Sequence, residues 1–244
     1  MRRFRPLALT RAVAALSVLF LVTGAFAAAP PTLPHVAHRI EAREPLRIVA
    51  LGSSSTEGIG ATAPDRTYPA VLQTILSHRL AGGVAVLNRG IGGQDADDMM
   101  RRLPGIIAEA PDLVIWQTGS NDALRGVPID RFERETRDGI AVLLKAGIDV
   151  MLMEPQLSER LANTPGSAGY VASVRSLGRA LRVPVVRRYD LMRQWLADGD
   201  LTKATMMSGD GLHMGDGGYQ KLAEAVADAI LAGSNAASPN VAAR

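Results

Sequence analysis

The segment over residues 47–58, RIVALGSSSTEG, joins a short, mostly apolar run to a cluster of small polar residues. An apolar run of this length that ends in glycine is typical of a strand buried on both faces of a parallel sheet. Three consecutive serines directly after it predict a tight loop, where a hydroxyl can be presented for chemistry. The segment therefore predicts a strand followed by a loop. Whether one of the serines carries chemistry depends on which residues lie beside them in the fold.

Similar apolar segments recur along the chain and alternate with segments of helical periodicity. This alternation predicts βαβ units, in which helices cover both faces of a parallel sheet. The expected strands span residues 47–51, 84–88, 113–118, 149–154 and 183–187. The expected helices span residues 67–80, 97–110 (interrupted or kinked at Pro104), 130–146, 170–181 and 217–231. We therefore predict an α/β fold with a five-stranded parallel sheet.

The first 27 of the 244 residues have the pattern of an export signal, with four arginines, an apolar stretch and the small-x-small site Ala25-Phe26-Ala27. The apolar stretch over residues 12–23 is shorter than the ~20 residues that span a bilayer. We therefore expect cleavage, no stable membrane insertion afterwards, and a periplasmic or secreted protein. Removing these arginines changes the formal net charge from +3 to −1, which argues against a nucleic-acid partner.

The same pattern predicts the division of the chain. After the signal over residues 1–27, residues 28–45 are rich in Pro and Ala, and we expect a leader that lies over the surface or is partly mobile. One domain follows over residues 46–232, and residues 233–244 are expected to form a disordered tail. Cysteine is absent from the sequence, so disulfides are excluded and the domain depends on its core.

Polar groups follow the expected strands at the edge where their carboxyl ends meet. A serine hydroxyl, a glycine-rich loop, an asparagine amide and an Asp/His pair are all predicted there. This set suits acyl transfer, which needs a nucleophile, a histidine base, an orienting carboxylate and donors for an oxyanion. Of the four histidines, only His213 lies in such a position, because His35 and His38 fall in the leader and His78 near a helix end.

The segments resemble four sequence blocks of the GDSL, or SGNH, hydrolase superfamily, in the same order. They are GSSSTEG (52–58), NRGIGGQD (88–95), GSND (119–122) and DGLH (210–213). The resemblance implies a three-layer αβα sandwich of flavodoxin-like strand order 2-1-3-4-5. It implies Ser54 as nucleophile, His213 as base and Asp210 as its partner. The Ser54 and Gly93 N–H groups and the Asn121 amide would form the oxyanion hole, with no metal or organic cofactor.

The first block departs from the pattern of the superfamily. Ser53 stands where relatives usually have Asp, and Ser55 stands where they usually have an aliphatic residue. The change at Ser53 removes a charge next to the nucleophile and a candidate anchor of the loop. We expect it to be tolerated, because that Asp is not a member of the triad.

Other interpretations of these residues are less well supported. The serine triplet alone suits a plain turn, and a phosphate-binding loop lacks the required Lys-Ser/Thr. Residues 58–63 fit G-x-G-x-x-A, but the glycines do not directly follow the strand. A metal site is conceivable at His35 and His38 or in the acidic cluster, but such residues more often lie on the surface or cap a helix. The acidic cluster comprises Asp95, Asp97 and Asp98.

The function expected from these residues is hydrolysis of carboxylic esters. We expect short acyl groups on small molecules or glycans, because the chain has few aromatic residues and short loops. Three alternatives stay open: a lysophospholipase- or thioesterase-like hydrolase, an acyltransferase to a sugar, and a carbohydrate- or envelope-binding module with weak turnover.

Overall fold

Five parallel strands form the centre of the structure, a computed structural model that describes residues 31–237. They are β1 (Leu46–Gly52), β2 (Val84–Gly90), β3 (Leu113–Gln117), β4 (Asp149–Met153) and β5 (Val185–Val186). Their order in the sheet is β2-β1-β3-β4-β5, which confirms the predicted fold class and strand order. The predicted signal over residues 1–27 lies outside the described residues, and between residues 31 and 237 we find no helix both long and apolar enough to cross a bilayer.

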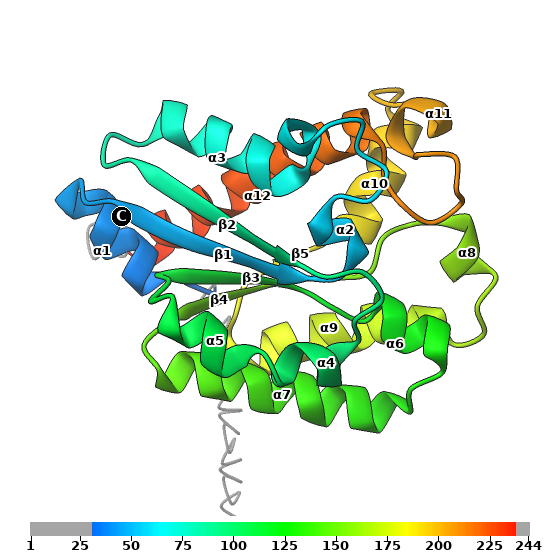
Figure 1. Cartoon of the computed structure of the whole chain (residues 1–244), viewed down its shortest axis with the longest axis horizontal. Coiled ribbons are helices and arrows are strands. Elements are labelled where there is room, and N and C mark those ends of the chain that lie inside the picture. The colour runs from blue at the N-terminus through cyan, green and yellow to red at the C-terminus, as the bar shows by residue number, and fades with distance from the viewer. Residues whose placement is uncertain (1–30, 238–244) are drawn as a thin grey trace, which may run out of the picture.

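Helices pack on both faces of the sheet and make the three layers (Figure 1). One face carries α1 (Pro34–Ala42), α3 (Tyr68–Arg79) and α12 (Asp216–Ala237). The opposite face carries α4 (Ala96–Met100), α5 (Leu103–Ala108), α7 (Ile129–Lys145) and α9 (Ser167–Leu181). Each layer thus removes one face of the sheet from water, as a fully apolar parallel sheet requires.

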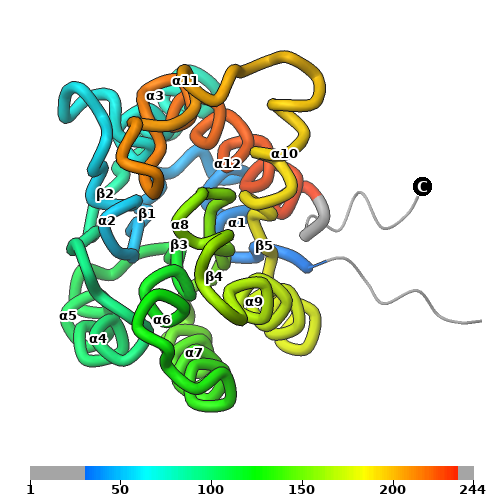
Figure 2. Tube along the Cα trace, turned by 90° about the vertical axis from the view of Figure 1, so that its right-hand side faces the viewer, coloured from blue at the N-terminus to red at the C-terminus, as the bar shows by residue number. Residues whose placement is uncertain are grey.

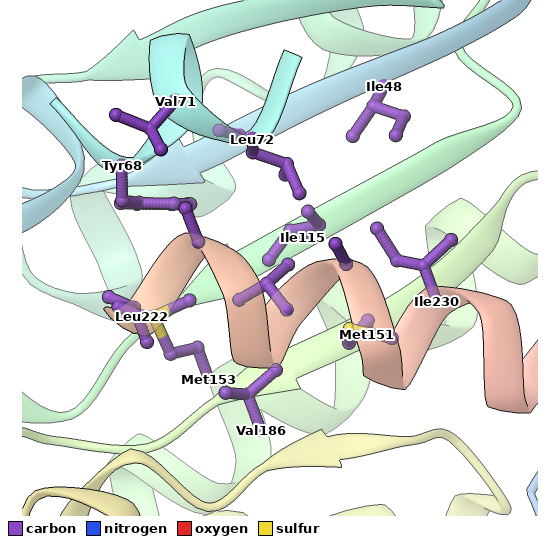
Figure 3. Close-up of a cluster of buried hydrophobic side chains, with 14 of the residues drawn as sticks. Ile48, Tyr68, Val71, Leu72, Ile115, Met151, Met153, Val186, Leu222 and Ile230 are labelled. Atoms are coloured by element: carbon purple, nitrogen blue, oxygen red, sulfur yellow. The ribbon is translucent and has the colours of Figure 1, made fainter. Parts of the chain in front are cut away.

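Alternate side chains of each strand enter the two separate cores. In β1, Ile48 joins the core under α12 and its neighbour Val49 joins the core under α7. Figure 3 shows the first core, which includes Ile115 and Met151 of two neighbouring strands and Ile230 of α12. These side chains are fully buried, and burying each contributes about 1.5–3 kcal/mol to folding.

Short helices gather at the carboxyl ends of the strands, the end that faces the viewer in Figure 2. The sequence did not predict them, because three to ten residues give little helical periodicity. They are α2 (Ser54–Glu57), η1 (Pro64–Arg66), α6 (Ser120–Arg125), α8 (Glu159–Ala162), α10 (Arg188–Ala197) and α11 (Lys203–Met206).

The interruption expected at Pro104 is present: the helical segment over residues 97–110 is divided into α4 and α5, with Pro104 in the first turn of α5. Proline has no N–H to donate and its ring crowds the preceding turn, so it begins a helix more readily than it continues one. One expectation about helices needs correction: α12 continues to Ala237, the last described residue, rather than stopping near residue 231, so residues 233–237 of the expected disordered tail are helical.

The expected leader over residues 28–45 also differs from the structure. From Leu33 onwards it packs on the domain, because Leu33 and Val36 are fully buried against the α12 face. The Leu33 N–H donates to the Gly233 carbonyl, and the Asp149 carboxylate accepts the Val36 N–H at the first turn of α1. Leu33 and Val36 near the start of the described chain and Ile230 of α12 are buried in the same core. This burial explains why α1 and the last turns of α12 belong to the domain.

Candidate active site

Three of the predicted side chains form one continuous chain of contacts. Ser54 Oγ lies 2.8 Å from His213 Nε2, and His213 Nδ1 lies 2.5 Å from Asp210 Oδ2. Ser54 and His213 are 159 residues apart in sequence, so the fold brings them together. The histidine is mostly covered, with 12% of its side chain exposed, whereas 44% of the Asp210 side chain is exposed. The hydroxyl faces an imidazole whose other nitrogen is held by a carboxylate.

The loop that carries Ser54, residues 52–58, is fixed to the sheet and is called here the Ser54 loop. Gln117 Oε1, at the end of β3, accepts the Ser53 N–H at 2.9 Å and the hydroxyls of Ser53 and Thr56, each at 3.2 Å. Gly90 of β2 allows close approach, since a Cβ there would lie 1.9 Å from the Glu57 backbone nitrogen. Ser53 is therefore a buried anchor of the loop, although it lacks the charge of the Asp that relatives usually have there.

The loop that carries His213, residues 207–214, is called the His213 loop and is held largely by its own contacts. Asp210 Oδ1 accepts the N–H of Leu212 at 2.8 Å and of His213 at 2.7 Å, while its Oδ2 holds the imidazole. Met207 and Met214 pair as an isolated antiparallel bridge at its base. One carboxylate thus shapes the loop and orients the histidine, which the Asp-x-x-His spacing permits.

The electrostatics of the pair favour an ionised Asp210. Partial burial alone would raise the pKa of its carboxyl, but hydrogen bonds from the His213 ring and from the N–H groups of His213 and Leu212 lower it well below the ordinary value. A carboxylate that stays charged is the partner that keeps the histidine tautomer with Nε2 free to accept a proton.

Gly93 and Asn121 lie on two segments joined to each other beside Ser54. Asn121 Nδ2 donates to the Gln94 carbonyl at 2.8 Å, which leaves the second proton of the amide available. The Cβ position of Gly92 lies 3.8 Å from Ser54 Cβ, and Gly93 follows with a φ of +78°, a conformation that favours glycine. Within residues 31–237, no acceptor engages the N–H of Ser54 or of Gly93.

Asp122 connects the segment that carries Gly93 to the segment that carries Asn121. Asp122 is 1% exposed, and its carboxylate accepts the N–H of Ala96 at 3.1 Å and of Gly119 at 3.2 Å. Burial raises the pKa of Asp122 to about 6, against these backbone hydrogen bonds, which lower it. The aspartate of the GSND segment therefore fixes the position of the loop that carries Gly93.

The acidic cluster and the leader histidines have structural surroundings. Asp95 caps α4 and forms a capping box with Asp98, and Arg125 pairs with both carboxylates. Asp97 pairs with Arg101 of the next turn. His35 and His38 lie on α1, at the amino end of the sheet. No group of three or more metal-ligating side chains is found in the described part of the chain.

Sequence reasoning missed the side chains that hold the two loops in place. Gln117 ends β3 and Gln156 follows β4, and both are buried. The sequence did contain one indication, because a polar glutamine ends an otherwise apolar strand. Such a position lies at the carboxyl edge of the sheet, where functional groups gather. Arg188 is also fully buried, and nothing in its local sequence indicated this.

The chain is similar to known esterases and lipolytic enzymes. An arylesterase from Vibrio mimicus is 26% identical over 187 residues, which cover 76% of this chain and 88% of the relative. A lipase/acylhydrolase structure from Enterococcus faecalis has a TM-score of 0.67 at 24% identity, covering 76% of this chain and 95% of that one. The structure of an acetyl xylan esterase has a TM-score of 0.66 at 22% identity, covering 76% of this chain and all (100%) of that one.

A family model extends the comparison to most of the sequence. The model of the non-GDSL lipase-like family matches residues 22–236, which include every segment of the site. Another structural neighbour, from Desulfitobacterium hafniense and named for the G-D-S-L family, shares the fold with a TM-score of 0.63 at 22% identity, covering 75% of this chain and 98% of that one. The lipase-like family and the shared fold are consistent with the resemblance to the GDSL/SGNH superfamily. The chain belongs to the non-GDSL lipase-like family.

Proposed function

We propose that the protein is a serine esterase that cleaves carboxylic esters through Ser54, His213 and Asp210. The observation that carries the proposal is the continuous contact from the Ser54 hydroxyl through His213 to Asp210, at 2.8 and 2.5 Å. Membership of a lipase-like family and similarity to an arylesterase support the same reaction class. A serine hydroxyl is a weak nucleophile until a neighbouring base takes its proton, and His213 is in place to do so.

The reaction proceeds in two steps. His213 Nε2 takes the Ser54 proton as Oγ attacks the ester carbonyl carbon, and the tetrahedral intermediate collapses when the alcohol leaves with that proton. Water, deprotonated by His213, then attacks the acyl-serine, and the proton returns to Ser54 as the acid is released. Asp210 stays ionised and stabilises the imidazolium that forms in both steps.

The developing oxyanion is stabilised by donors on the other side of Ser54. The N–H groups of Ser54 and Gly93 have no acceptor in the described chain, and Asn121 keeps one amide proton after bonding Gln94. Donors that are already fixed before the reaction cost no reorganisation, and each contributes on the order of 10²–10³ in rate.

Short acyl esters, on small molecules or on glycans, are the proposed substrate class. Ser54 and His213 are each partly exposed, so the reacting pair opens on to the surface. The hollow of about 780 Å³ next to the His213 loop, lined in part by Leu157, Met206 and Gly211, includes neither of them. Structural similarity to an acetyl xylan esterase makes acetylated sugars a natural class to test.

The test is hydrolysis of p-nitrophenyl esters of increasing acyl length by the wild type and by Ser54→Ala. We expect turnover to be highest for acetyl to butyryl esters and to vanish in the variant. Equal rates for the two proteins would overturn the esterase proposal and favour a binding module. Preference for long acyl chains or acyl-thioesters would redirect the substrate class, and acyl-sugar formed in place of free acid would identify a transferase.

Export is a separate part of the proposal and rests on the sequence of residues 1–27 alone. We propose cleavage after Ala27 and a periplasmic or secreted location. N-terminal sequencing of the protein recovered from the periplasm or medium of an expressing bacterium tests it. A new terminus at Ala28 is expected, and an intact Met1 in the cytoplasm would contradict it.

A further inference from the structure

The side chain of Gln156 is buried between two segments of the site. Its Oε1 accepts the Ser120 hydroxyl at 2.9 Å, and its Nε2 donates to the Leu212 carbonyl at 3.2 Å. Ser120 directly precedes Asn121, and Leu212 directly precedes His213. One amide therefore connects the segment of the proposed oxyanion donor to the loop of the proposed base.

A buried cation fixes the direction of that amide. Arg188 is fully buried, and its Nη2 donates to Gln156 Oε1 at 2.7 Å while its Nε donates to the Glu154 carbonyl at 3.0 Å. The Glu154 carboxylate binds Arg175, and among residues 31–237 no carboxylate hydrogen-bonds to Arg188. Burial lowers the pKa of Arg188 to about 10, so the guanidinium remains charged at neutral pH.

The charge of Arg188 leaves Gln156 only one orientation. A guanidinium only donates hydrogen bonds, so it must face the amide oxygen. The amide NH₂ must then point the other way, towards the Leu212 carbonyl. Turning the amide over would set donor against donor at Arg188 and acceptor against acceptor at Leu212, and both buried groups would lose their partners.

We propose that Gln156, oriented by Arg188, is a positioning residue that holds the His213 loop so that His213 Nε2 meets Ser54. A second hydrogen bond joins this loop to the segment after β4: the Arg160 N–H donates to the Gly211 carbonyl at 3.0 Å. The hydrogen bond from Gln156 is made to Leu212, which directly precedes His213, whereas Gly211 lies one residue further away. This inference rests on the proposed esterase function, and it adds a role for a buried pair that the triad does not use.

The substitution Gln156→Glu separates positioning from packing. A glutamate keeps the volume, accepts from Ser120 and pairs with the Arg188 charge, so we expect the thermal midpoint to stay at or above that of the wild type. Its second oxygen would face the Leu212 carbonyl, acceptor against acceptor, and release the loop. A displacement of about 1 Å at a catalytic group can cost about 10²-fold in rate.

The experiment measures kcat, KM and hydrogen exchange over residues 207–215 in the wild type, Gln156→Glu and Gln194→Glu. Gln194 is exposed on α10, so it adds the same charge without touching the loop. We expect kcat for p-nitrophenyl acetate to fall about 10- to 100-fold in Gln156→Glu with KM little changed. Exchange of the 207–215 segment should become faster in the same variant, and the control should match the wild type in both.

Each outcome decides the inference. A fall in kcat without faster exchange, faster exchange without a fall, or neither change would overturn it. If the wild type itself lacks esterase activity, the proposed function fails, and exchange alone still shows whether Gln156 holds the loop. If Gln156→Glu does not fold, the double variant Gln156→Leu/Arg188→Met takes its place, because removing both polar partners avoids leaving a buried charge unpaired.

Discussion

The Ser54 loop and the His213 loop meet at one hydrogen bond, yet they are built in opposite ways. The Ser54 loop is buried in the sheet edge, with Ser53 and Ser55 each 2% exposed. Three donors of that loop converge on Gln117. The His213 loop projects from the edge, and its shape depends on the carboxylate of Asp210. The comparison shows that three donors share one acceptor in the Ser54 loop, whereas in the His213 loop one carboxylate, that of Asp210, both orients the imidazole and accepts two N–H groups of its own loop.

The largest expected effects follow from the single carboxylate. Asp210→Asn keeps one acceptor but loses the charge that holds the His213 tautomer, and we expect kcat to fall by about 10⁴. His213→Ala should fall at least as far. Steady-state ester hydrolysis measures both, and a rate within tenfold of the wild type for Asp210→Asn would remove Asp210 from the triad.

An intermediate effect is expected from Asn121→Ala. The variant loses one proposed oxyanion donor and the bond to the Gln94 carbonyl. We expect kcat to fall about 10²–10³-fold. KM should change much less, because the donor acts on charge that develops in the transition state. A variant that loses affinity for substrate while keeping kcat would show that Asn121 binds the ground state instead.

A smaller effect is expected in the Ser54 loop, where three donors share the acceptor Gln117. Ser53→Ala removes one of three donors to Gln117, and the Ser53 N–H and Thr56 hydroxyl remain. We expect a loss of about 1 kcal/mol in unfolding free energy and a rate within about tenfold of the wild type. Urea unfolding and the ester assay measure the two quantities, and an inactive, folded Ser53→Ala would show that the register of the serines is shifted.

A further effect, on stability rather than on rate, is a pH dependence at Asp122, beneath the segments that carry Gly93 and Asn121. Its pKa is about 6 in the folded protein against 3.8 for the ordinary value, so the folded state binds its proton more readily. The penalty for burying the charge is present above pH 6 and disappears as the pH falls towards 4. Wild type should therefore gain stability relative to Asp122→Asn between pH 7 and pH 4. A pH-independent difference in thermal midpoint would contradict this.

The sequence predicted the parts of this molecule that repeat a simple pattern. Short apolar segments such as the one that contains Val49 indicated the strands of the sheet. The resemblance to the GDSL/SGNH blocks indicated Ser54, Asp210 and His213 as candidates. It did not predict α1, because a Pro- and Ala-rich composition hides the two apolar side chains that pack against α12. It also did not predict Gln117, Gln156 or Arg188, whose roles depend on contacts between residues far apart in the chain.

The most direct test of the central claim is to locate the reactive hydroxyl. Labelling the wild type with a fluorophosphonate and mapping the adduct by tandem mass spectrometry distinguishes three adjacent serines, two of them buried. The adduct is expected on Ser54, and labelling should disappear in His213→Ala, which keeps the serine but lacks the base. An adduct on Ser53 or Ser55, or undiminished labelling in His213→Ala, would contradict the account.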